Sequence, residues 1–61
     1  MAWVIEVTPT GADVLHDSRI CQYDLDDVEE ALRYIQRHRD YRPGEDIFVE
    51  EMDGYRSPVR L

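Results

Sequence analysis

The feature that most constrains this chain is its shortness combined with a single cysteine. A domain of 61 residues buries only about 60% of the surface that its unfolded chain exposes. Cys21 has no second cysteine with which to form an internal disulfide. The fold must therefore come from packing around one small core, and we expect residues 1–61 to form a single compact domain. A lone cysteine is typical of proteins in a reducing compartment such as the cytoplasm.

The chain is strongly acidic, with 14 acidic and 7 basic residues and a formal net charge of −7. A field of this sign repels phosphate backbones and anionic lipids, so we expect no direct nucleic-acid binding and no membrane binding. No stretch approaches the roughly 18 apolar residues of a spanning helix. The first residues lack the basic flank and long apolar run of a signal peptide. These features predict a cytoplasmic protein.

The N-terminal third predicts extended structure. Residues 3–8 are rich in aromatic and β-branched side chains and predict a strand. Pro9 and Gly11 then favour a turn. Residues 14–23 are extended but irregular, because polar residues interrupt their apolar positions. A bulge or bend near Asp17 and Ser18 would switch the inward face.

The clearest element is an amphipathic helix. Apolar residues recur at spacings of three and four, as expected for one buried helix face, at Leu25, Val28, Leu32 and Ile35. Asp24 is the predicted N-cap. Acidic residues occupy the first turns and arginines the last, which complements the helix dipole. Pro43 and Gly44 disfavour continuation, so we expect the helix to end near Asp40.

The C-terminal third predicts a β-hairpin. Residues 46–52 and 55–61 flank Asp53-Gly54, a pair that favours a type I′ turn. Pro58 lacks a backbone N–H, so the last strand should lie at a sheet edge. The predicted cross-strand pairs are Met52 with Tyr55, Glu51 with Arg56, and Phe48 with Val59.

These elements define an α+β protein. The expected order is β-β-α-β-β, and the expected architecture is a small antiparallel sheet with one amphipathic helix packed on one face.

Residues that suggest catalysis or metal binding are better explained by structure. The acidic residues 24–30 lack the glycine of a calcium loop and coincide with the helical apolar pattern. His16, Cys21 and His38 are fewer ligands than a structural zinc site requires. The same three residues suggest a Cys-His nucleophile pair, but no glycine-rich oxyanion loop accompanies them. We therefore predict no enzymatic activity, no cofactor and no metal.

The acidic residues offer a hypothesis of binding. One acidic segment lies near residues 26–30 and a second near residues 45–53, with arginines between them. If the two segments lie on one face, they would imitate the phosphates of a duplex and occupy the binding surface of a nucleic-acid-binding protein, as a DNA mimic does. The alternative is ordinary solubility through surface charge. Tyr41, between Arg39 and Arg42, is either a contact residue or a cover for the helix end. The predicted partner-binding residues are Asp26, Glu29, Glu30, Tyr41, Glu50, Glu51 and Asp53.

The helix opening also carries a resemblance. Two strands followed by Asp24-Leu25-Asp26-Asp27-Val28-Glu29-Glu30-Ala31-Leu32 resemble HicB-type antitoxins, whose helix often begins with a Thr-Leu-Glu-Glu-Ala-Leu-like run. The resemblance points toward small regulators that act by binding. We predict a non-enzymatic protein of phage or mobile-element type that binds a basic surface on another protein and modulates or inhibits it. The alternative is a homo-oligomeric structural or antitoxin-like module, a homodimer for example, paired through the last strand.

Overall fold

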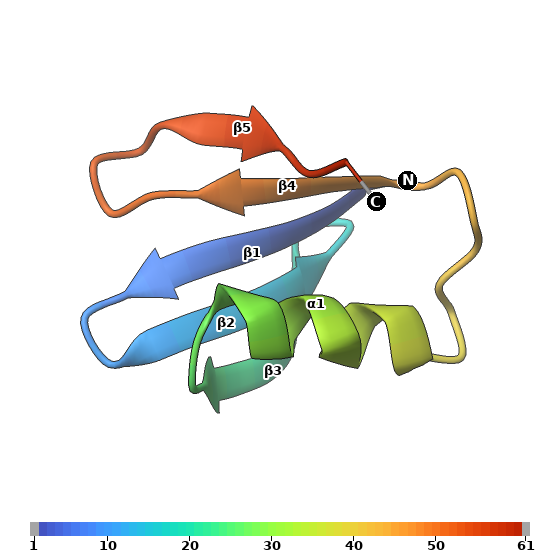
Figure 1. The fold of residues 1–61 in the computed structure, drawn as a ribbon, viewed down its shortest axis with the longest axis horizontal. Coiled ribbons are helices and arrows are strands. Elements are labelled where there is room, and N and C mark those ends of the chain that lie inside the picture. Colours follow the sequence, from blue (N-terminus) through green and yellow to red (C-terminus); the bar gives the residue numbers. More distant parts are fainter. Residues whose placement is uncertain (1, 61) are drawn as a thin grey trace.

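The computed structural model describes residues 2–60. In it, one helix lies across one face of a five-stranded sheet (Figure 1). The sheet has the spatial order β3-β2-β1-β4-β5. The α+β class and the single helix on a small sheet are confirmed. The elements are β1 (Ala2–Thr8), β2 (Gly11–His16), β3 (Arg19–Leu25), α1 (Val28–Arg37), β4 (Asp46–Glu50) and β5 (Arg56–Pro58).

The irregular extended region is two strands rather than one. Asp17 and Ser18 both have left-handed backbones, with φ of 51° and 68°, and form a two-residue turn that reverses the chain between β2 and β3. The predicted bend is therefore a complete hairpin, and the order is β-β-β-α-β-β. Two register shifts between β2 and β3 explain why the apolar positions of this region do not alternate regularly.

The sheet is mixed, which corrects the expectation of a wholly antiparallel one. β1 pairs in parallel with β4, while the other neighbouring strands pair antiparallel. The reason is the helix: α1 carries the chain from the end of β3 back across the sheet, so β4 starts at the same end as β1 (Figure 1).

The helix begins later and ends earlier than predicted. Leu25 is the last residue of β3. Asp24 also belongs to β3, has a left-handed φ of 57° and does not cap the helix. The N-cap is Asp27, whose Oδ1 accepts a hydrogen bond from the Glu30 N–H at 2.8 Å. The Glu30 side chain accepts one in return from the Asp26 N–H at 3.1 Å. The prediction of Asp24 as the cap was wrong because several aspartates near the start are equally suitable by chemistry.

The C-terminal hairpin has a register one residue away from the predicted one. Phe48 pairs with Pro58, and Glu50 pairs with Arg56. Two backbone hydrogen bonds close a three-residue loop: the Glu51 N–H donates to the Tyr55 carbonyl oxygen, and the Gly54 N–H donates to the Glu51 carbonyl oxygen. Gly54 in this loop has a φ of 91°. Since a slip of one residue exchanges the faces, Phe48 and Val59 do not pair, and Glu50 rather than Glu51 meets Arg56. Leu61, predicted to end the last strand, lies outside the described residues.

The core lies between α1 and one face of the sheet. Trp3 and Ile5 from β1 and Ile35 from α1 are completely buried. Gly11 is required where β2 passes β3, because a Cβ there would overlap the carbonyl oxygen of Leu25. The remaining buried apolar residues are Ala12, Val14, Ala31, Ile47 and Val49. Within residues 2–60, the helix is too short and too polar to cross a membrane.

Candidate functional site

Although Glu45 and Asp46, which begin the second acidic segment, lie at one end of the molecule, the topology places the acidic residues 26–30 and 50–53 together at the opposite end. β3 and β4 both finish at this end, α1 begins there, and the β4–β5 loop extends from it (Figure 1). Side-chain contacts across the end include Thr10 Oγ1, which lies 3.4 Å from Asp24 Oδ1. We call this region the acidic end; its carboxylates are Asp24, Asp26, Asp27, Glu29, Glu30, Glu50, Glu51 and Asp53. It contains all the acidic residues that the sequence predicted for partner binding.

The carboxylates of the acidic end divide into those that hold the structure and those that do not. Asp27 caps α1, and Glu50 forms a 2.8 Å ion pair with Arg56. Within residues 2–60, three exposed members make no side-chain hydrogen bond or ion pair: Asp26, Glu29 and Glu51. Their charges therefore remain available to a partner.

A row of carboxylates that the sequence prediction missed crosses the sheet beside this end. Glu6 of β1 pairs in register with Asp13 of β2 on one side and with Glu50 of β4 on the other. Glu50 pairs in turn with Arg56 of β5. We call Asp13, Glu6 and Glu50 the acidic row. Glu6 alternates with the buried Ile5, so its outward position was readable from the sequence, but its acidic neighbours depend on strand pairing.

Tyr41 is the predicted partner-binding residue that lies elsewhere. It belongs to the loop after α1, at the opposite end of the molecule (Figure 1). Its half-buried ring lies 6.4 Å from the Trp3 ring in an edge arrangement. Trp3 also stacks on His16 at 3.9 Å and contacts His38 by an edge at 5.1 Å. Tyr41 thus packs against the core at this end.

Glu45 ties this second end together. Its Oε1 accepts hydrogen bonds from the Arg42 N–H at 2.7 Å and the Trp3 indole N–H at 3.3 Å. Its Oε2 lies 3.5 Å from His16 Nε2, a buried atom without a hydrogen-bond partner within residues 2–60. The Arg42 N–H bond in particular lowers the pKa of Glu45, with Trp3 and His16 adding to it against partial desolvation. We call Trp3, His16, His38, Tyr41 and Glu45 the aromatic end.

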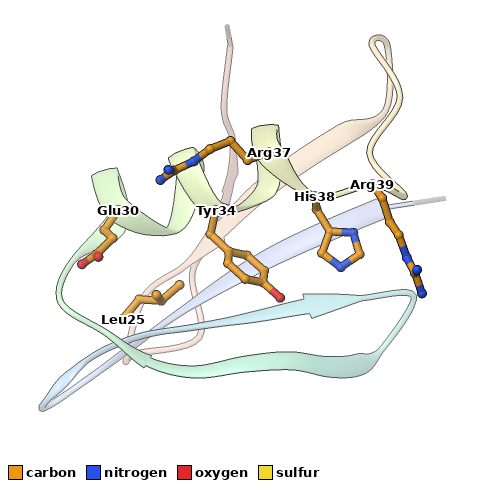
Figure 2. Close-up of a pocket in the computed structure, with 6 residues that line it drawn as sticks. All are labelled: Leu25, Glu30, Tyr34, Arg37, His38 and Arg39. Atoms are coloured by element: carbon orange, nitrogen blue, oxygen red, sulfur yellow. The ribbon is translucent and has the colours of Figure 1, made fainter.

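A groove lies between α1 and the edge strand β3, with a volume of about 540 Å³. Figure 2 shows the Tyr34 ring and Leu25 between the helix and the strand, while Arg37 extends along the outer side of the helix. The Tyr34 hydroxyl donates a 3.4 Å hydrogen bond to the Cys21 carbonyl oxygen, and burial raises the pKa of this hydroxyl, with a smaller contribution from Cys21. The Tyr34 hydroxyl thus helps hold α1 against β3 and is not free to act in the groove.

No protein-family model, curated protein or solved structure matches this chain. The resemblance to HicB-type antitoxins accordingly rests on the helix opening alone. Residues Asp24 and Leu25 of that opening belong to β3 rather than to α1.

Proposed function

We propose that this chain is a small, non-enzymatic interaction protein that binds a basic surface on another protein through its acidic end and thereby modulates or inhibits that protein. One observation carries the proposal: the fold gathers the acidic residues 26–30 and 50–53, distant in sequence, at one end of the molecule. The carboxylates of Asp26, Glu29 and Glu51 at this end make no side-chain hydrogen bond or ion pair within residues 2–60.

Several arginines lie far from the acidic end, although Arg56 pairs with Glu50 there. Arg37, Arg39 and Arg42 lie at or beyond the C-terminal end of α1, away from the acidic end. The acidic end holds eight of the 14 acidic residues and therefore presents a negative local field. Such a field accelerates the encounter with a basic surface and orients the approach. Ordinary solubility requires net charge but no such segregation. A nucleic-acid-binding protein is a natural partner, since its basic surface is built for rows of negative charge.

The proposed site of action is the cytoplasm. Cys21 is a half-buried free thiol, and a reducing compartment keeps it from oxidation.

The test compares two variants with equal change in net charge. Glu29→Arg/Glu51→Arg reverses exposed carboxylates at the acidic end, and Asp40→Arg/Asp46→Arg reverses exposed carboxylates elsewhere. Tagged proteins capture partners from nuclease-treated lysate of the source organism, with elution by a salt gradient and identification by mass spectrometry. We expect a nucleic-acid-binding protein retained by the wild type and by Asp40→Arg/Asp46→Arg but lost from Glu29→Arg/Glu51→Arg.

Moderate salt should release this partner, because exposed charges are screened beyond a Debye length of about 8 Å at physiological ionic strength. A partner that both double variants retain equally would disprove the role of the acidic end. Equal loss from both variants would show that net charge, not its position, governs retention.

A further inference from the structure

The sheet face opposite α1 carries a continuous apolar stripe. Val4 of β1 pairs in register with Leu15 of β2 and with Phe48 of β4. Leu15 pairs with Ile20 of β3, and Phe48 pairs with Pro58 of β5. Paired residues lie on the same side of a sheet, so the stripe crosses all five strands. We call this side the open face and the stripe the apolar row: Ile20, Leu15, Val4, Phe48 and Pro58.

Nothing in the described chain covers this row. α1 packs on the other face, against Ile5 and Val14 (Figure 1). Ile20 is 40% exposed, and Val4, Leu15 and Phe48 are only partly buried. A hollow of about 360 Å³ opens on the face, lined in part by Val4 and Leu15. Solvated sheet faces are normally polar, so an uncovered apolar stripe with exposed ends at Ile20 and Pro58 favours an interaction site.

The acidic row runs directly beside the apolar row. On β1, Glu6 lies two residues from Val4, and on β4, Glu50 lies two residues from Phe48, so each pair shares the open face. Like charges on directly paired strand positions repel one another. Among the described residues, Arg56 pairs with Glu50, and Asp13 Oδ1 accepts a hydrogen bond from the Asp24 N–H at 3.0 Å, while the Glu6 side chain makes no hydrogen bond or ion pair. The open face therefore combines an apolar stripe with a parallel line of partly uncompensated negative charge.

We propose that the open face docks a basic amphipathic helix of the partner, laid along the apolar row with its cationic side chains over the acidic row. This proposal rests on the proposed function and specifies what the partner presents. Charge complementarity selects the occupant: apolar residues on one stripe of the helix meet the apolar row, and flanking lysines or arginines meet Glu6, Asp13 and Glu50.

The dimensions agree with such an occupant. Five strands at about 4.8 Å spacing make a row about 19 Å long. A helix rises about 1.5 Å per residue, so about 13 residues cover that length. A partner helix of three to four turns, an ordinary length in globular proteins, therefore covers the whole row.

A second copy of this chain is a poorer occupant. It would bring a second acidic row and another net charge of −7 to the interface. Close approach of like charges opposes association.

The first experiment titrates ¹⁵N-labelled wild-type protein with a synthetic peptide of about 14 residues, with leucines on one helical stripe and lysines elsewhere. A scrambled peptide of the same composition, which has no apolar stripe, is the control. We expect saturable amide shifts at Val4, Leu15 and Phe48 with the amphipathic peptide, with α1 unaffected. We expect at least tenfold weaker binding of the scrambled peptide.

Variants then separate the two rows. Phe48→Ser removes an apolar-row side chain, while Met52→Ser removes an equally apolar side chain that is 67% exposed and lies in the β4–β5 loop. We expect Phe48→Ser to weaken peptide binding at least tenfold and Met52→Ser to leave it unchanged. Glu6→Gln should weaken binding severalfold and reduce its salt dependence. Thermal melts of each variant establish whether the fold is retained. The amide shifts of the wild-type protein on peptide titration provide a test that does not depend on any substitution.

Three results would overturn the inference. Shifts confined to α1 and the β4–β5 loop would place the peptide on the acidic end alone. The absence of shifts at millimolar peptide and low salt would show that the open face does not bind such helices. Shifts on the open face that depend on protein concentration without peptide would make a second copy the occupant.

The inference and the proposed function can fail separately. A captured partner that is lost from Glu29→Arg/Glu51→Arg but kept by a folded Phe48→Ser would preserve the proposed function and disprove the docking site.

Discussion

The two ends of this molecule use charged side chains in opposite ways. At the aromatic end, Glu45 accepts hydrogen bonds from Trp3 and Arg42, and Asp17 accepts one from the Ala2 N–H at 3.2 Å. At the acidic end, Asp26, Glu29 and Glu51 have no such partners within residues 2–60. Charge at the first end holds a small core closed, while the acidic end combines structural carboxylates such as Asp27 and Glu50 with others that face solvent without a partner.

This difference matters because the chain is small. Domains of this size have a free energy of unfolding of about 3–9 kcal/mol, and each unfavourable contact takes a large share of it. Carboxylates such as Asp26, Glu29 and Glu51, which have no side-chain partner within residues 2–60, are consistent with a role in binding. The following substitutions test the comparison, in order of decreasing expected effect.

Trp3→Ala should have the largest effect on stability. Trp3 is completely buried and contacts His16, His38 and Tyr41, so its loss leaves a large cavity at the aromatic end. We expect a loss of about 3–5 kcal/mol, a large share of the free energy of unfolding of so small a domain. Urea unfolding monitored by circular dichroism measures this loss of stability. Tyr55→Ala, at a side chain that is 67% exposed, is the control and should change stability little. A folded, stable Trp3→Ala protein would contradict the structural role of this end.

Glu45→Gln should cause a smaller loss, and the loss should depend on pH. The pKa of Glu45 is lowered in the folded protein, chiefly by the Arg42 N–H. Its ionised form therefore stabilises the fold above its ordinary pKa of 4.5, and this contribution disappears as the pH falls through the lower folded value. Wild type should lose stability over that acidic range, and the variant should show a flatter profile. Thermal melts from neutral to acidic pH test this; parallel profiles would exclude Glu45 as the cause.

At the acidic end, one carboxylate should matter to stability and its neighbours should not. Asp27→Ala removes the N-cap of α1 and should cost about 1 kcal/mol. Glu29→Ala and Glu51→Ala remove side chains without structural partners and should stay within about 0.5 kcal/mol of wild type. Urea unfolding of the three variants measures the contrast. A loss for Glu51→Ala equal to that for Asp27→Ala would erase the distinction between the two ends.

Glu6→Gln should stabilise the free protein. It removes the middle charge of the acidic row, flanked in register by Asp13 and Glu50, and relief of this repulsion should contribute about 0.2–1 kcal/mol. The sharpest test compares this gain in stability with peptide binding, because the same substitution should weaken binding of the basic peptide. Urea unfolding and peptide titration on one preparation measure both effects. A destabilised Glu6→Gln protein would show that the row is not a repulsive surface.

Much of the fold was predictable because its signals are local. The helical spacing of Val28, Leu32 and Ile35, the extended run around Trp3 and the turn at Asp53-Gly54 each arise within a few residues. The errors arose where local chemistry permits two solutions. Asp24 and Asp27 are equally good caps, and Asp53-Gly54 fits a two-residue or a three-residue loop.

The sequence by itself determined that this protein is acidic, lacks an internal disulfide, and forms strands around one amphipathic helix. Only the tertiary structure decided that the acidic residues 26–30 and 50–53 share an end, that Glu6 lies between Asp13 and Glu50, and that an apolar row crosses the open face. The physical reason is that periodicity along the chain sets which residues point inward or outward within an element. Neighbours across the sheet are set by strand order and register, which depend on contacts between residues far apart in the sequence.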